Sequence, residues 1–159
     1  MITLYDPLVL FLCRYVKDHH TAEDIAMDVF ADLVVHKHRY NFRVSLKTYL
    51  FMLGKSRALN YLKRRQRIAD VPIEELPLQG EEPSAEAQYA IDQRKKALHA
   101  AMAELPEDMA EALYLMYFED LSYEEIARVM KRTKKQVDNL LYRGKQRLRA
   151  ILEEGGIDP

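Results

Sequence analysis

Cationic and amide side chains gather near the C-terminal end of the sequence, over residues 134–149, at a spacing that suits one helix. An amide side chain can pair with adenine through a donor and an acceptor together, and a lysine can reach the acceptor atoms of guanine. The candidates for base contacts are Lys134, Lys135, Gln136, Asp138 and Asn139, and those for phosphate contacts are Arg143, Lys145 and Arg147. These residue types predict duplex DNA as a partner. The alternative is a solvated cationic helix that packs only on its own domain.

Two capping boxes predict the helices that would position these side chains. Ser122 is followed three residues later by Glu125, and Thr133 is followed at the same distance by Gln136. Each pair predicts a helix that begins directly after its hydroxyl residue. Only residues 131–132 are left for the connection, so the turn must be tight. With apolar residues at helical spacing on both segments, the sequence predicts a helix-turn-helix whose second helix exposes its cations.

The composition favours an all-α protein. The 159 residues are 48% hydrophobic, with five glycines, six prolines and few β-branched runs. The net charge is -1, but the positive and negative side chains are separated along the sequence. Residues 55–67 hold six cations and no acid, and residues 68–92 hold seven acids and no cation. Such segregation produces local fields that suit nucleic acid. With Cys13 as the single cysteine, no internal disulfide can form, which suits the reducing cytoplasm. No apolar run is long enough to span a bilayer, so we expect a cytoplasmic protein with no membrane contact of its own.

The predicted organisation is two small helical domains joined by a flexible acidic linker. The first domain covers residues 1–67. Its helices are expected over 7–17, 22–37 and 46–65, with Asp6, Thr21 and Ser45 as N-caps. The linker covers residues 68–86 and is rich in proline and acids. The second domain covers residues 87–159, with helices expected over 85–105 and 107–117 before the helix-turn-helix.

Two groups of side chains in the first domain also suit DNA. The basic end of its third helix interleaves cations such as Arg64 with Asn60 and Tyr61, a combination that fits a DNA backbone beside exposed bases. The preceding loop offers two aromatic rings, an amide and a cation in Tyr40, Asn41, Phe42 and Arg43. The alternatives are compensation of the helix dipole by the cations, and anchoring of the loop in the core by Tyr40 and Phe42.

An acidic stripe marks the expected second helix, because Asp24, Asp28 and Asp32 recur every four residues. The apolar residues expected to face the core are Ile25, Ala26, Val29, Phe30, Leu33 and Val34. The stripe could be a solvated face or pair with a partner's arginines. A third alternative is a metal site, since Asp24 and Asp28 are close in sequence to His19, His20, His36 and His38. A hydrolytic site needs ligands that converge from several elements, so no metal is expected. The sequence has no glycine-rich phosphate loop and no nucleophile with an obvious base, so neither a catalytic site nor a cofactor is expected.

The order of these segments resembles the extracytoplasmic-function (ECF) sigma factors of bacterial RNA polymerase. In the first half the likeness rests on AEDIAMDVF at residues 22–30 and SLKTYLFMLGKSRALNYLKRR at residues 45–65. In the second half it rests on LPEDMAEALYLMYFEDLSYEEIARVM and VDNLLYRGKQRLR. The chain departs from the usual pattern at Lys131, where the turn commonly has glycine, and at Gln136, where the recognition helix commonly has threonine.

The resemblance implies a sigma factor, with sigma domain 2 followed by sigma domain 4, that binds core RNA polymerase and directs promoter recognition. The helix-turn-helix would bind the -35 element, and the first domain would recognise and melt the -10 element, with a base pocket in the loop at residues 40–43. Docking on the β′ clamp helices would use Asp24, Asp28, Val29 and Phe30. The β flap and an anti-sigma factor would be further partners. The alternative is a polymerase-independent helix-turn-helix regulator, which would need a dimer face or a sensor domain.

Overall fold

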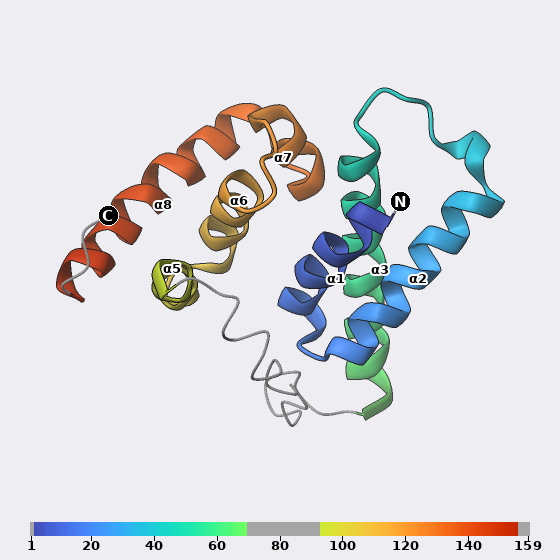
Figure 1. Ribbon diagram of the computed structural model, residues 1–159, viewed down its shortest axis with the longest axis horizontal. Coiled ribbons are helices and arrows are strands. Elements are labelled where there is room, and N and C mark those ends of the chain that lie inside the picture. The colour runs from blue at the N-terminus through green and yellow to red at the C-terminus, as the bar shows by residue number, and fades with distance from the viewer. Residues whose placement is uncertain (1, 70–92, 156–159) are drawn as a thin grey trace. The chain divides into compact units, whose positions relative to one another are not determined.

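The computed structural model describes residues 2–69 and 93–155, and every regular element within those ranges is a helix (Figure 1). The chain divides into two compact units, residues 1–81 and 82–159. The predicted all-α class with two helical domains is therefore confirmed. The predicted acidic linker over 68–86 lies, beyond its first two residues, outside the described part of the chain.

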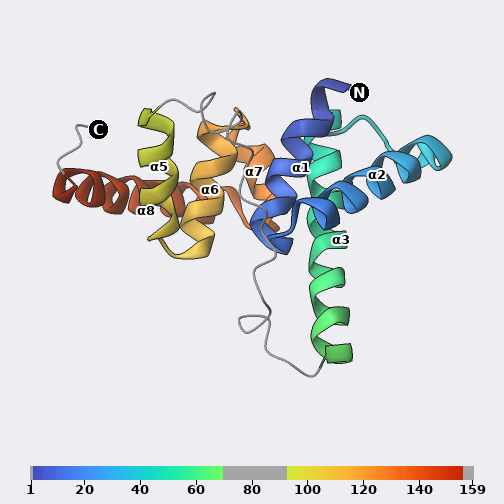
Figure 2. The same ribbon diagram turned by 60° about the horizontal axis from the view of Figure 1, so that its bottom comes forward.

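The first unit is built from three helices that all contact one another: α1 (Ile2–Val16), α2 (His19–Val35) and α3 (Leu46–Ala69). A short 3-10 turn, η1 (Lys37–Arg39), follows α2. The core side chains include Leu8, Phe11, Leu12, Ala22, Val29, Leu50 and Phe51. The rings of Phe11 and Phe51 stack with centroids 4.7 Å apart and join α1 to α3. The C-terminal part of α3 extends past α1 and α2 (Figure 2). Its side chains Lys63, Arg64 and Arg67 are exposed.

The start of α3 follows the prediction, because the hydroxyl of Ser45 accepts a hydrogen bond from the backbone N–H of Thr48 at 3.1 Å. The helix continues to Ala69, beyond the predicted end at residue 65. Gly54 lies where α3 crosses α1. A Cβ added there would lie 2.9 Å from Leu8 Cδ1 and 3.1 Å from Leu12 Cδ2, so only glycine permits this approach of the two helices.

The predicted start of α1 is wrong. The helix begins at Ile2, so Asp6 is not its N-cap and Pro7 lies inside it rather than at its first position. Proline lacks an N–H and therefore costs one helical hydrogen bond. The apolar side chains of α1 outweigh that loss, since Leu8, Phe11 and Leu12 are fully buried.

The predicted start of α2 is also wrong. The N-cap is Asp18 rather than Thr21: its backbone is extended, and its carboxylate accepts a hydrogen bond from the N–H of His20 at 3.3 Å. The hydroxyl of Thr21 donates to the same carboxylate at 2.5 Å. These hydrogen bonds, that of Thr21 first, hold the pKa of Asp18 below its ordinary value. The helix ends at Val35, short of the predicted residue 37, because the chain turns into η1.

The second unit packs three helices against a long fourth one: α5 (Gln93–Ala103), α6 (Glu107–Tyr117), α7 (Tyr123–Met130) and α8 (Lys134–Glu154). The helix expected over 85–105 is described from residue 93 onward, and the one expected over 107–117 is confirmed. Gly144 lets α8 approach α6 closely, since a Cβ there would lie 3.1 Å from Leu113 Cδ1. The buried side chains include Leu113, Leu115, Ile126, Val137, Leu141 and Leu148.

Both capping boxes form, so α7 and α8 begin at the predicted residues. In the second box the hydroxyl of Thr133 accepts from the N–H of Gln136 at 3.1 Å, and the side-chain carbonyl of Gln136 accepts from the N–H of Thr133 at 2.9 Å. The turn between the helices is made by Lys131, which adopts a left-handed conformation with φ 55° and ψ 48°. A non-glycine residue pays about 1–2 kcal/mol for that conformation. The helix-turn-helix predicted from the sequence is confirmed.

Candidate nucleic-acid interface

The first two turns of α8 present polar side chains on one face and apolar ones on the other. Lys134, Lys135, Gln136, Asp138 and Asn139 are all exposed. Val137, Leu140 and Leu141 are buried against the rest of the unit. The helix therefore places every residue predicted to contact bases on a surface that a DNA groove could cover, because the N-terminal residues of such a helix approach base edges.

The amide of Gln136 is already engaged at one end. Its carbonyl oxygen accepts the N–H of Thr133, which holds the side chain back toward the start of α8. Bidentate pairing with adenine needs the carbonyl and the amino group of the amide together. The capping role thus competes with the pairing predicted for this side chain.

Cations around the turn of the helix-turn-helix form a shallow hollow of about 330 Å³, lined mainly by Arg128, Arg132, Lys134 and Glu124. The ammonium of Lys134 lies 3.6 Å from the Glu124 carboxylate, and the guanidinium of Arg132 lies 3.8 Å from that of Asp108. Exposed pairs of this kind contribute little stability, so both cations can exchange their partner for a phosphate at small cost. The hollow therefore gathers three cations beside one carboxylate at the surface.

Arg143 and Lys145 lie on different sides of α8. Arg143 is exposed and continues the stripe of Lys135 and Asn139 at four-residue spacing. Lys145 is half-buried, with its ammonium 5.9 Å from the centre of the Tyr117 ring of α6. A phosphate contact suits Arg143 directly, whereas Lys145 also serves the packing of α8 on α6.

In the first unit, the loop before α3 displays one aromatic ring and anchors another. The hydroxyl of Tyr40 donates to the carbonyl of Val44 at 2.7 Å, and its ring lies 5.0 Å from that of Tyr49. Phe42 is 82% exposed, has a positive φ of 64°, and lies 4.6 Å from the Tyr40 ring. The half-buried Tyr40 therefore holds the loop against α3, and core anchoring by Phe42 is wrong.

The other polar residues of this loop are exposed. The side-chain carbonyl of Asn41 accepts from the backbone N–H of Arg43 at 3.0 Å, which closes a turn around Phe42. The amino group of Asn41 and the guanidinium of Arg43 remain on the surface. The loop thus brings together a fixed ring, a displayed ring, an amide and a cation, which are the groups that a stacked, unpaired base requires.

A groove of about 650 Å³ runs between α2 and α3 and joins two sets of predicted residues. From α3 it is lined by Arg57, Asn60, Tyr61 and Arg64, and from α2 by Asp24, Asp28 and Asp32. The guanidinium of Arg57 lies 3.6 Å from the Asp32 carboxylate. Arg57 was missed from the sequence, although its spacing to Asn60, Tyr61 and Arg64 places all four on one helix face. Cations on one wall face carboxylates on the other, so the acidic stripe is not simply a solvated face.

The outer surface of α2 differs from the prediction in its apolar residues. Val29 has no exposed surface and packs in the core, so it cannot contact a partner. Val34, expected in the core, is 50% exposed, and Met27 and Val35 are 59% and 70% exposed. Phe30 is half-buried with its ring 6.1 Å from that of Tyr5. An apolar strip of Met27, Val34 and Val35 therefore accompanies the exposed carboxylates of α2.

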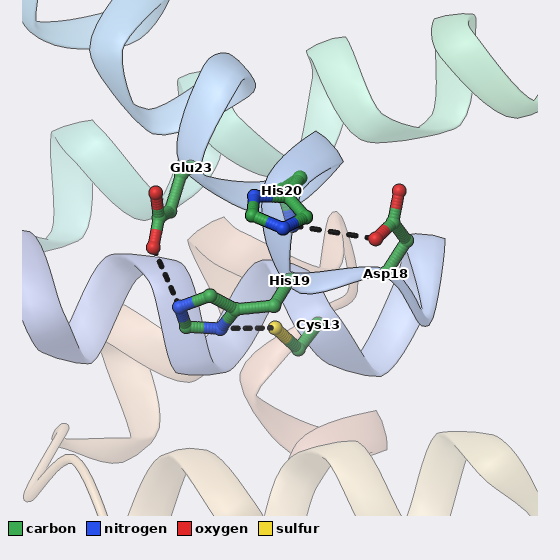
Figure 3. Close-up of polar contacts among 5 residues, drawn as sticks. All are labelled: Cys13, Asp18, His19, His20 and Glu23. Atoms are coloured by element: carbon green, nitrogen blue, oxygen red, sulfur yellow. Dashed lines mark hydrogen bonds and ion pairs between the residues drawn. The ribbon is translucent and has the colours of Figure 1, made fainter. Parts of the chain in front are cut away.

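Cys13, His19 and Glu23 lie in a row at the junction of α1 and α2 (Figure 3). Cys13 Sγ is 3.9 Å from His19 Nδ1, and His19 Nε2 is 2.6 Å from Glu23 Oε1. Burial, followed by the charges of Asp18 and Glu23, raises the pKa of the Cys13 thiol. A nucleophilic cysteine needs the opposite shift, so this row does not favour nucleophilic catalysis. Within the described residues, no three His, Cys, Asp or Glu side chains are placed to hold a metal ion.

Two helical units, one with a helix-turn-helix and the other with exposed cations on α3 and a displayed ring, define a two-domain helical DNA-binding protein. Comparison with known families specifies the class. Residues 1–68 match the model of sigma-70 region 2, and residues 95–148 match that of sigma-70 region 4.

Individual relatives agree with these matches. The chain is 31% identical over 148 residues to the ECF RNA polymerase sigma factor SigM of Bacillus subtilis, covering 91% of this chain and 88% of SigM. It is 29% identical over 153 residues to the RNA polymerase sigma-H factor of Pseudomonas aeruginosa, covering 89% and 78%. The sigma factor RpoE of Bartonella quintana, solved in complex with the anti-sigma factor NepR, shares the fold with a TM-score of 0.72 at 21% identity, over 96% of this chain and 93% of that one.

The chain belongs to the ECF sigma factors of bacterial RNA polymerase. It binds core RNA polymerase and directs it to promoter DNA, and the alternative of a polymerase-independent regulator is not favoured. Sigma factors are transcription initiation factors rather than enzymes. No helix in the described ranges is long and apolar enough to cross a membrane.

Proposed function

We propose that the first two turns of α8 read the -35 element in the major groove. The observation that carries this proposal is the exposure of Lys134, Lys135, Gln136 and Asn139 on a helix whose start is fixed by a capping box. Arg143 and the cations of the turn would hold phosphates and set the position of the helix without reading sequence.

The first unit would capture the -10 element as single-stranded DNA. The backbone would follow the basic face of α3, where Asn60 and Arg64 are exposed and Arg57 and Tyr61 are half-buried. One base would turn out of the stack onto Phe42, with Asn41 and Arg43 beside it. Flipping a base costs a few kcal/mol, which stacking and hydrogen bonding in the loop would offset.

Core polymerase would bind α2. Carboxylates at Asp24 and Asp28 can pair with arginines of the β′ clamp helices, while Phe30 and the strip of Met27, Val34 and Val35 supply apolar area. The β flap would contact the second unit, and the protein would act in the cytoplasm with the polymerase. RpoE of Bartonella quintana binds the anti-sigma factor NepR, which supports an anti-sigma factor as a further partner.

Replacing Lys135 with alanine should weaken recognition of a cognate -35 element by about 1–3 kcal/mol, because Lys135 would lose its contact with a base edge. Run-off transcription with core polymerase, on promoters varied in the -35 element, measures this loss. Lys96→Ala, which removes an exposed lysine of α5 that is not among the proposed DNA contacts, serves as the matched control and should have no effect. An equal loss on every sequence would mark Lys135 as a phosphate contact instead.

Reversing both charges of Asp24 and Asp28 to lysine should weaken binding to core polymerase at least about tenfold, since close charge pairs across an interface carry about 1.5–7 kcal/mol. Both side chains are exposed, so the fold should persist. Titration of core enzyme with labelled protein gives the affinity. The control reverses Glu153 and Glu154, which makes the same change of charge at the exposed end of α8. Normal binding by the Asp24 and Asp28 double variant would remove α2 as the docking surface.

A further inference from the structure

The capping box of α8 fixes which end of the Gln136 side chain faces outward. The backbone N–H of Thr133 is a donor, so the atom that it meets at 2.9 Å must be the carbonyl oxygen of the amide. The reversed orientation would place two donors against each other. The amino group, Nε2, is therefore the end of this exposed side chain that remains available to a ligand.

We propose that Gln136 is a specificity-determining residue that donates a hydrogen bond to one base of the -35 element and rejects cytosine there. This inference rests on the proposed reading of the -35 duplex by α8. In the major groove guanine offers N7 and O6, adenine offers N7 and thymine offers O4 as acceptors, whereas cytosine offers only the N4 amino donor. A fixed donor therefore accepts three bases and opposes the fourth.

Bidentate pairing with adenine is disfavoured by the same hydrogen bond. Presenting the carbonyl to adenine would turn it away from the cap and leave the N–H of Thr133 without that partner. The first N–H groups of a helix have no intrahelical acceptor, so side chains such as Gln136 complete the capping arrangement. If the capping box is retained and Nε2 donates to the base, the N–H of Thr133 and the amino group of Gln136 both have a partner.

Gln136→Glu tests the proposal because it preserves the capping box while it exchanges the outward donor for an acceptor. Transcription by the holoenzyme is measured on a promoter library randomised across the -35 element. The wild type should disfavour cytosine at one base. The Glu variant should shift the ratio at that base toward cytosine by about threefold to tenfold, the effect of one hydrogen bond. The ratio between sequences is the readout, because the added negative charge lowers binding to all DNA.

Gln136→Met is the control for the outward group: it keeps the length of the side chain, offers no donor and only a weak acceptor, and gives up the Gln136 half of the capping box. It should flatten the preference at the same base without favouring cytosine. Thermal unfolding of both variants shows that α8 is retained. An unchanged base ranking in the Glu variant overturns the inference. If Lys135→Ala still lowers transcription selectively on particular -35 sequences, the reading of the -35 element by α8 stands without the role of Gln136. If Lys135→Ala and Arg143→Gln both have no effect, both proposals fall.

Discussion

Replacing Phe42 with alanine should reduce run-off transcription by about 5- to 150-fold, because stacking of a base on an aromatic ring contributes about 1–3 kcal/mol. The ring is 82% exposed and is held beside Tyr40 by the turn that Asn41 closes. The variant should unfold at the same denaturant concentration as the wild type, since it loses almost no buried area. A template with a mismatched, already open -10 region should recover part of the activity, because the cost of unpairing is removed.

Two further variants of Phe42 separate the ring from the backbone. Glycine adopts the positive φ of 64° without strain, so Phe42→Gly should be as inactive as the alanine variant although its loop is relaxed. Phe42→Tyr keeps the aromatic face and should keep most of the activity. Full transcription by the alanine variant on a duplex template would show that the displayed ring does not capture a base.

Replacing Gly54 with valine should lower the free energy of unfolding of the first unit by about 2–3 kcal/mol, through overpacking where α1 crosses α3. Its Cβ would lie 2.9 Å from Leu8 and 3.1 Å from Leu12, and both leucines are fully buried, so their side chains must shift within the core. The added methyl groups of valine would contact the same two leucines. Urea unfolding followed by far-UV circular dichroism measures the change.

Ser56→Val is the control for Gly54→Val, because it places the same β-branched residue at an exposed position of α3 and should cost well under 1 kcal/mol. A double variant tests the mechanism. Leu8→Ala alone should destabilise the unit by about 2–5 kcal/mol, but combined with Gly54→Val it should cost less than the sum, since one change fills the space that the other empties. Strict additivity would contradict the contact as the cause.

Local signals explain what the sequence could predict. Each capping box is complete within four residues, so the starts of α7 and α8 were predicted correctly. The start of α2 was missed because Asp18 and Thr21 are both good caps, and only the folded chain shows that Thr21 donates to Asp18. The start of α1 was missed because Pro7 looked like a first helical residue, although buried side chains carry the helix through it.

Tertiary contacts explain what the sequence could not predict. Val29 and Val34 share one apolar pattern on α2, yet the first is buried and the second half exposed, because α1 and α3 cover only part of the helix. Asp32 and Arg57 face each other across the groove only because α2 packs against α3, and no local pattern encodes that packing. The display of Phe42 depends on Tyr40 taking the anchoring position in the loop.

The self-contained start of α8 also has a use in engineering. Thr133 and Gln136 fix the register of the helix by themselves, and the buried Val137 and Leu140 fix its rotation. The exposed positions between them can then be randomised without moving the backbone. Libraries at Lys134, Lys135, Asp138 and Asn139 would be a source of orthogonal factor–promoter pairs for synthetic gene circuits.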